Sequence, residues 1–200
     1  MKKVIFLLVF FISIAGYCQL KFDVTVVENF HKNLNKEFST KDESPLTDED
    51  RAVFEKLDFF PINSKYYVLA KFTRTDSEKP FEMKTTKERR PIYVKYGELA
   101  FTIDEKPFVL NLYKNIELSK KEEYKDYLFL PFSDASNGNE TYIGGRYIDM
   151  KIPNSDVVAI DFNLAYNPYC AYNYKYSCPI VPLDNDLKIE IFAGVKKFHN

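Results

Sequence analysis

The sequence predicts a mainly β protein: an antiparallel meander, barrel or sandwich, of about eight or nine strands with two short N-terminal helices. Two observations predict this class. Between residues 65 and 194, apolar and polar residues alternate in short segments separated by turn residues, which is typical of strands. No segment of helical period and crossover length lies between these strands, which argues against a parallel α/β sheet.

The first eighteen residues have the pattern of a secretory signal peptide. A basic start precedes an apolar run from Val4 to Ile14, and small residues follow it. The run is too short to span a bilayer comfortably. We therefore expect residues 1–18 to be removed, which leaves an exported, periplasmic or secreted protein without a transmembrane segment. The alternative is a lipoprotein acylated at Cys18. Lipoprotein processing favours a small residue directly before the cysteine, and Tyr17 fits that requirement poorly.

Charge and length limit the partners and the number of domains. Removal of Lys2 and Lys3 lowers the basic count from 28 to 26 against 29 acidic residues, a net charge of about −3. A weakly acidic chain with scattered lysines gives no electrostatic reason to bind nucleic acid or anionic lipid. The length and the absence of repeats predict one β-rich domain over residues 19–200, with a helical lead-in to residue 60.

The lead-in carries signals for two helices. Apolar residues at spacings of three and four predict a helix over residues 19–38 that packs on the sheet. They are Val27, Phe30, Leu34 and Phe38. A second, short helix is predicted after Thr47, which is placed to cap it, with three acidic residues in the first turn. Val53, Phe54 and Leu57 are expected to face inward, and Pro61 ends any continuation.

Period-two alternation then marks the strands. The predicted strands are residues 65–73, 92–96, 99–103, 108–113, 128–132, 146–152, 157–163 and 187–193. Tyr96-Gly97-Glu98 and the segment 104–107 are expected to be turns between neighbouring strands.

Strand parity indicates where polar residues converge. Asp134 continues the apolar face of strand 128–132, and Arg146 continues the apolar face of strand 146–152. A guanidinium on an apolar face needs an anion. We expect Asp134, Glu140 or Asp161 to pair with Arg146. Two long loops, 134–146 and 163–182, are then expected to leave the same end of the sheet.

This convergence predicts a binding site for a small polar ligand, a saccharide or a peptide fragment. The candidate ligand-binding residues are Asp134, Glu140, Arg146, Asp161, Asn163, Tyr166 and Asn167. The alternative is a carboxylate-dependent hydrolase, with or without a cation, that uses Glu140 or Asp161 as acid or base. A third hypothesis is a purely structural network in an envelope protein. Residue spacing does not decide between them.

Metal chemistry has little support in the sequence, so no metal site is predicted, and the sequence does not identify a cofactor. The only histidines, His31 and His199, lie outside the two long loops, which argues against zinc. The oxygen-rich segment 134–140 lacks the glycine position of a helix-loop-helix calcium site. Cys170 and Cys178 remain after export. In an oxidising compartment we expect them to form a disulfide worth about 2–3 kcal/mol.

The stretch from Leu128 to Gly194 resembles the bacterial family catalogued as domain of unknown function 1684. The resemblance rests on the motifs F-x-D, G-x-E-T-Y-x-x-G-R, D-F-N-x-A-Y-N-P-x-C-A, C-P-x-x-P, N-x-L and A-G, which begin here at Phe132, Gly138, Asp161, Cys178, Asn185 and Ala193. Residues 44–46 and 59–61 are similar to short, exported members from Bacteroidetes-like bacteria.

The resemblance implies which residues to watch and supplies no activity, substrate or cofactor. Ser136, Val181 and Val195 depart from the pattern at positions where threonine, proline and, in many longer members, glutamate stand. Members that look cytoplasmic carry the same cysteine pair, so the resemblance leaves a structural or metal role open beside the disulfide.

Overall fold

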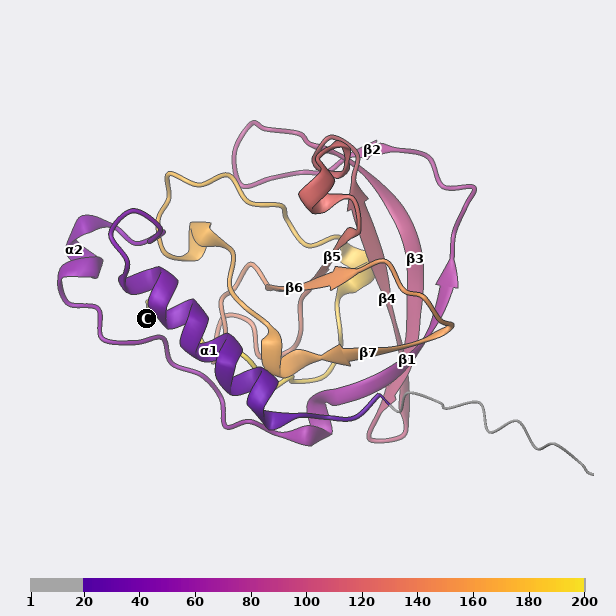
Figure 1. Ribbon diagram of the computed structural model, residues 1–200, viewed down its shortest axis with the longest axis horizontal. Coiled ribbons are helices and arrows are strands. Elements are labelled where there is room, and N and C mark those ends of the chain that lie inside the picture. Colours follow the sequence, from indigo (N-terminus) through magenta and orange to yellow (C-terminus); the bar gives the residue numbers. More distant parts are fainter. Residues whose placement is uncertain (1–19, 200) are drawn as a thin grey trace, which may run out of the picture.

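Seven strands form one antiparallel sheet that curls into a half-barrel (Figure 1). The computed structural model describes residues 20–199, so the predicted signal peptide lies outside the described residues. The strands are β1 (Tyr67–Arg74), β2 (Phe81–Glu82), β3 (Ile92–Ile103), β4 (Lys106–Asn115), β5 (Tyr127–Phe132), β6 (Arg146–Lys151) and β7 (Val157–Asp161). Their order is β6-β5-β4-β3-β1-β7, and β2 pairs with β3. The mainly β, antiparallel prediction is confirmed.

The strand count is lower than predicted because two expected strands are one. Residues 92–96 and 99–103 both belong to β3, and the expected turn at Gly97 is a bulge in its pairing with β4. A Cβ atom on Gly97 would lie 2.7 Å from the carbonyl oxygen of Thr73. Glycine therefore lets the neighbouring strand approach while β3 continues through the irregularity.

The last predicted strand, residues 187–193, is not a strand in the structure. Its apolar residues Leu187, Ile191 and Ala193 are buried, as alternation predicted. Its neighbourhood has one parallel bridge, between Ser133 and Asp186, and no ladder among the described residues. Leu187 and Ile189 form backbone hydrogen bonds with Ser133 and Ala135, just after β5. The partners of the following C-terminal segment, residues 191–197, are described with the candidate site.

Both predicted helices are present. The first, α1 (Val24–Ser39), begins at Asp23, whose carboxylate accepts the backbone N–H of Thr25 at 2.9 Å. The second, α2 (Asp48–Ala52), is capped by Thr47 as predicted. It ends one residue before Val53, whose side chain is 80% exposed, so the prediction that Val53 faces inward is wrong. Within residues 20–199, no helix has the length and apolar character needed to cross a membrane.

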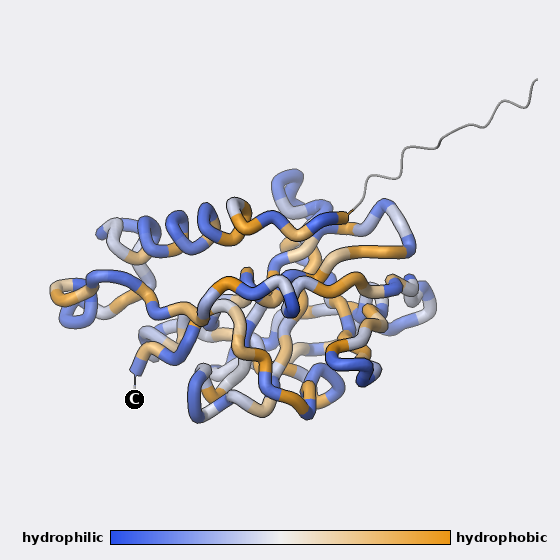
Figure 2. The backbone as a smooth tube through the Cα atoms, turned by 90° about the horizontal axis from the view of Figure 1, so that it is seen from below, coloured by the Kyte–Doolittle hydropathy of each residue, from blue (hydrophilic) through white to orange (hydrophobic). Residues whose placement is uncertain are grey.

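Both faces of the sheet carry buried side chains. The inner face packs the main core, which includes Leu128, Leu130 and Ile148. The opposite face of the same strands carries a second, aromatic cluster that includes Phe129 and Tyr147. Figure 2 shows α1, largely hydrophilic in colour, as a separate layer along one side of the molecule. A sheet buried on both faces needs a covering element on each side.

The segment after β7 covers the aromatic face. In Figure 1 it leaves the sheet toward the side of α1 and α2 and then returns. Near its start, Tyr166 and Tyr147 exchange two backbone hydrogen bonds of 2.9 and 3.0 Å. Near its end, the backbone N–H of Ile180 donates to the carbonyl of Lys84 at 2.8 Å. The covering loop, residues 163–182, is thus attached to β6 near its start and to the segment that follows β2 near its end.

Candidate functional site

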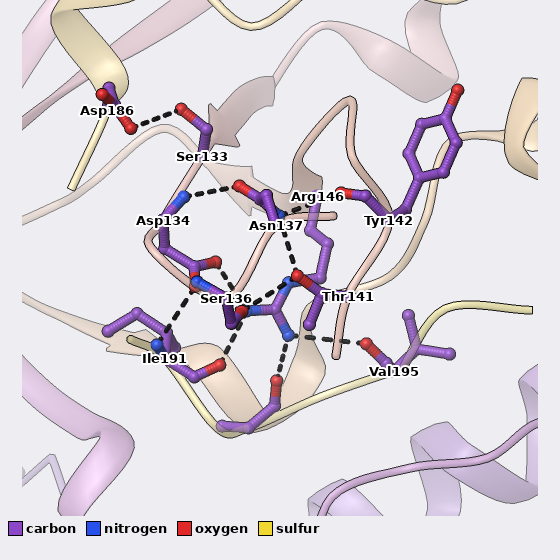
Figure 3. A network of polar contacts seen from close by, with 11 residues as sticks. Ser133, Asp134, Ser136, Asn137, Thr141, Tyr142, Arg146, Asp186, Ile191 and Val195 are labelled. Carbon is purple, nitrogen blue, oxygen red and sulfur yellow. Dashed lines mark hydrogen bonds and ion pairs between the residues drawn. The ribbon is translucent and has the colours of Figure 1, made fainter. Parts of the chain in front are cut away.

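The arginine that sequence parity singled out lies in a closed network (Figure 3). Arg146 Nη2 donates to Asp134 Oδ2 and to the Ile191 carbonyl, both at 2.8 Å. Arg146 Nη1 donates to the Ala193 carbonyl. The other carboxylate oxygen of Asp134 accepts the N–H groups of Ser136 at 2.9 Å and Ile191 at 3.2 Å. Of the three carboxylates expected to pair with Arg146, the structure selects Asp134.

Neither side chain of this pair has exposed surface. Burial lowers the pKa of Arg146, and the carboxylate of Asp134 opposes that shift. The guanidinium also lies within hydrogen-bond reach of the Val195 carbonyl, at 3.5 Å. Three alternate carbonyls, those of Ile191, Ala193 and Val195, therefore turn toward one guanidinium, which takes the place of a neighbouring strand for this stretch. Before it, the Leu187 N–H donates to the Ser133 carbonyl at 2.8 Å, and the Ile189 carbonyl accepts the Ala135 N–H at 2.9 Å.

Local backbone geometry places Arg146 at the start of β6. Gly145 has φ +84°, and a Cβ atom there would lie 2.6 Å from the carbonyl oxygen of Phe132. Only glycine fits both conditions without strain. The following residue then enters β6 opposite Phe132, with its side chain turned into the core.

A second polar cluster lies at the end of β7. Asn163 Nδ2 donates to Asp161 at 2.7 Å and to the Asn63 carbonyl at 3.0 Å, and the Asn63 N–H returns a bond of 2.9 Å. His31 Nε2 lies 3.2 Å from the Asn163 carbonyl, so it donates this bond. Burial raises the pKa of Asp161 and lowers the pKa of His31. This cluster joins α1, the segment before β1 and the covering loop.

The remaining predicted residues hold the C-terminal segment. Asn167 is buried, and its Nδ2 donates to the Lys196 carbonyl at 2.9 Å. Glu140 has an exposed side chain, and its backbone carbonyl accepts the Lys197 N–H at 3.0 Å. In the part of the chain that the structure describes, four of the predicted residues thus lie around one C-terminal segment, residues 191–197: Asp134, Arg146, Glu140 and Asn167. Ligand contact by these residues stays a prediction, and the burial of all but Glu140 does not favour it.

An aromatic cleft of about 430 Å³ lies elsewhere, between the outer face of the sheet and the covering loop. We call it the tyrosine cleft. Eight aromatic side chains line it, among them Tyr93, Tyr127, Phe129, Tyr147 and Tyr166. The partly buried face of α1 contributes Phe30, Leu34 and Glu37. Of the predicted ligand-binding residues, only Tyr166 lines this cleft.

Asp149 of β6 organises the cleft chemically. Its Oδ1 accepts the hydroxyl groups of Tyr127 at 2.8 Å and Tyr166 at 2.6 Å. Burial, followed by the neighbouring Asp149 carboxylate, raises the pKa of both tyrosines. Both tyrosines are neutral near pH 7, as an unshifted tyrosine would be, and they donate to a carboxylate whose orientation they fix.

Two more charged groups stand in the cleft wall. Tyr169 donates its hydroxyl to Glu37, and burial, followed by this bond, raises the pKa of Tyr169. Arg89 Nη2 donates to the Ser177 carbonyl at 2.7 Å. The wall thus presents two carboxylates and one guanidinium among rings.

The cysteine pair borders the cleft. Cys178 lines it, and the Cys170 backbone N–H lies 3.1 Å from Cys178 Sγ. Both are thiols in this structure. The Cys178 thiol hydrogen-bonds to Cys170, which lowers the pKa of Cys170 to about 6 and raises the pKa of Cys178. Their closeness is compatible with the predicted disulfide, which stays a prediction.

Sequence reasoning missed Asp149, Tyr127 and Tyr147, because it followed the inward parity of β5 and β6. A signal was present in the other parity: Tyr127, Phe129 and Tyr147 alternate with core residues, so both faces of these strands are apolar. Such strands need cover on each side, and a cleft can form under the cover.

Comparisons with known proteins agree with the resemblance seen in the sequence. The family model described as "Protein of unknown function (DUF1684)" matches residues 52–196. A solution NMR structure of an uncharacterized protein from Haloarcula marismortui is similar, with 30% sequence identity and a TM-score of 0.67. The match covers 86% of this chain and 93% of that chain. A search of curated proteins found no match.

Proposed function

The chain belongs to the DUF1684 family, and since membership brings no activity with it, we propose from its own geometry that it binds a small ligand in the tyrosine cleft. The observation that carries this proposal is a concave, aromatic site around one oriented carboxylate, Asp149. Ligand sites are typically concave and largely apolar, with a few placed polar groups and volumes of roughly 300–1,000 Å³.

The ligand that fits is a saccharide or a peptide fragment. Tyrosine walls supply large contact area with few rotatable bonds, and they accept the flat face of a sugar ring or a peptide side chain. Asp149 and Glu37 supply acceptors for hydroxyl or amino groups. The buried Asp134–Arg146 pair would then serve the fold that holds the cleft.

The hydrolase alternative receives less support. Its candidate residues, Glu140 and Asp161, are not among the residues that line the cleft in the described chain. The Asp161 carboxylate accepts a hydrogen bond from the Asn163 amide, and the Glu140 side chain is exposed to solvent. We therefore develop the binding function alone.

The test is a binding screen of mono- and disaccharides and of dipeptides, read by thermal shift and confirmed by NMR. We expect at least one compound to raise the melting temperature of the wild type and to lose its effect in Tyr166→Phe and Tyr176→Ala. A matched control is Tyr174→Ala, a tyrosine that is 84% exposed and does not line the cleft. No binder in either class, or a binder unaffected by both cleft variants, would defeat the proposal.

A further inference from the structure

We infer that the group held beside Asp149 is a positively charged amine, so that the ligand of the tyrosine cleft is an organic ammonium ion. This inference rests on the proposed binding function and narrows its ligand class. It selects amino-bearing ligands, such as a peptide with a free amino terminus or an amino sugar, over neutral saccharides and acids.

The charge of the cleft wall is the first argument. Asp149 and Glu37 are acidic, and Arg89 is the one basic residue among the lining residues described. Arg89 already donates to the Ser177 carbonyl, and no ion pair joins it to either carboxylate among residues 20–199. The wall therefore has one excess negative charge, which complements a cation.

The hydrogen bonding of Asp149 is the second argument. Oδ1 is occupied by two tyrosine hydroxyls, and no partner for Oδ2 is found in the described part of the chain. Hydroxyl donors are neutral, so they orient the carboxylate without cancelling its charge. An ammonium group at Oδ2 would form a charge-assisted hydrogen bond, which is roughly twice as strong as a neutral one.

The aromatic walls are the third argument. The negative faces of tyrosine rings attract cations, with about 0.5–1 kcal/mol at exposed sites and about 2 kcal/mol where the cation is desolvated. Tyrosine hydroxyls with an ordinary pKa are already protonated near pH 7, and burial raises the pKa of the cleft tyrosines further. The rings can thus contact both the ammonium group and the apolar body that carries it.

Three probes with the same aromatic body and different end groups test the inference: 2-phenylethylamine, 2-phenylethanol and phenylacetate. Dissociation constants are measured by NMR titration near pH 7 and low salt. We expect the amine to bind at least about tenfold more tightly than the alcohol, since the bond to it is charge-assisted. Phenylacetate is expected to bind most weakly.

Asp149→Asn separates charge from shape. Its amide oxygen can still accept from Tyr127 and Tyr166, so we expect the folded cleft to bind the alcohol within twofold of wild type while the preference for the amine disappears. Glu140→Gln is the matched control and should leave the preference unchanged, since this exposed carboxylate does not line the cleft.

The outcomes separate this inference from the proposed function. Alcohol binding as tight as amine binding in the wild type would overturn the ammonium inference, and so would an amine preference that survives in Asp149→Asn. If none of the three probes binds while a saccharide does, the inference fails and the binding function stands. If saccharides and dipeptides also do not bind, both the ammonium inference and the proposed binding function are contradicted.

Discussion

At the scale of single residues, the Asp134–Arg146 pair has a structural role that follows from its complete burial. Removing both charges from water costs several kcal/mol, and their attraction offsets this only if other hydrogen bonds are satisfied. Here the backbone of residues 191–193 supplies bonds to Nη1 and Nη2 of Arg146 and to Oδ1 of Asp134, while Arg146 Nε has no partner among residues 20–199. The pair therefore fixes where residues 191–195 lie.

Loss of either partner should be severe. We expect Arg146→Met and Asp134→Asn each to lower the free energy of unfolding by about 3–5 kcal/mol, because each leaves its partner charged and buried. Urea denaturation of each variant and of the wild type measures this change in the free energy of unfolding. Arg51→Met is the control: its ion pair with Asp48 lies at the surface, with the Asp48 side chain 86% exposed, so its loss should change stability little. Equal effects for Arg51 and Arg146 would contradict this role.

His31 should make the fold sensitive to mild acid. Burial lowers its pKa below the ordinary value of 6.5, so the unfolded chain takes up the proton first as pH falls. Stability is therefore lost between pH 6.5 and the lower pKa of the folded state. Asp161 acts oppositely at lower pH, because burial raises its pKa above 3.8.

The measurement is stability against pH for wild type and His31→Gln. A glutamine amide can still donate to the Asn163 carbonyl, so we expect the variant to fold and to show a shallower loss of stability just below pH 6.5. Identical pH profiles would show that His31 does not titrate differently in the folded state.

At the scale of elements, Asn185 bridges two strands, β4 and β5, where their direct pairing stops. Strands β4 and β5 are in register at one pair only, Tyr113 with Phe129. Buried Asn185 donates to the carbonyls of Asn111 at 2.9 Å and Pro131 at 2.6 Å, and it accepts the Asn111 N–H at 2.9 Å. One side chain therefore satisfies backbone groups of both strands where they separate.

Asn185→Ala should weaken the contact between β4 and β5. It leaves three buried backbone groups without partners, each worth about 1–3 kcal/mol. We expect a marked loss of stability and faster hydrogen exchange at Asn111, with β1 and β3 less affected. Uniform protection across the sheet would contradict the bridging role. Asn115→Ala, at the partly exposed end of β4, is the comparison.

Oxidation of the two cysteines in the covering loop should raise the stability of the fold. We propose that Cys170 and Cys178 form a disulfide in an oxidising compartment, where it would add about 2–3 kcal/mol by the chain-entropy relation. The intact mass of protein isolated from such a compartment should rise by the mass of two hydrogen atoms on reduction, and Cys170→Ser/Cys178→Ser should match the reduced form in stability. Free thiols in protein taken from that compartment would refute the disulfide.

The elements also mark how far the sequence can predict the site. Alternation located β1 and β4 to β7, and Thr47 located α2, because these signals are local. It failed at Gly97, where a glycine serves a bulge instead of a turn, and at residues 187–193, whose partners are the backbone just after β5 and the Arg146 guanidinium. Pairing partners of this kind depend on tertiary contacts that periodicity does not encode.

At the scale of the whole molecule, the polar residues divide into two groups. Those that carry the family resemblance, such as Asp134, Arg146, Asn163 and Asn185, hold loops and the C-terminal segment in place. Those around Asp149 line a cleft between sheet, covering loop and α1. Sequence reasoning assigned ligand contact to the first group and, apart from Tyr166, missed the second, because composition does not distinguish buried polar groups from accessible ones.

The most direct measurement is a backbone chemical-shift map of the folded protein titrated with the tightest binder from the saccharide, dipeptide and phenylethylamine panel. The tyrosine cleft predicts shifts concentrated at Tyr127, Asp149, Tyr166 and Ser177, with little change at Ser136 and Ile191 beside the buried ion pair. Shifts centred on Ser136 and Ile191, with the cleft unchanged, would contradict the division between scaffold and binding site.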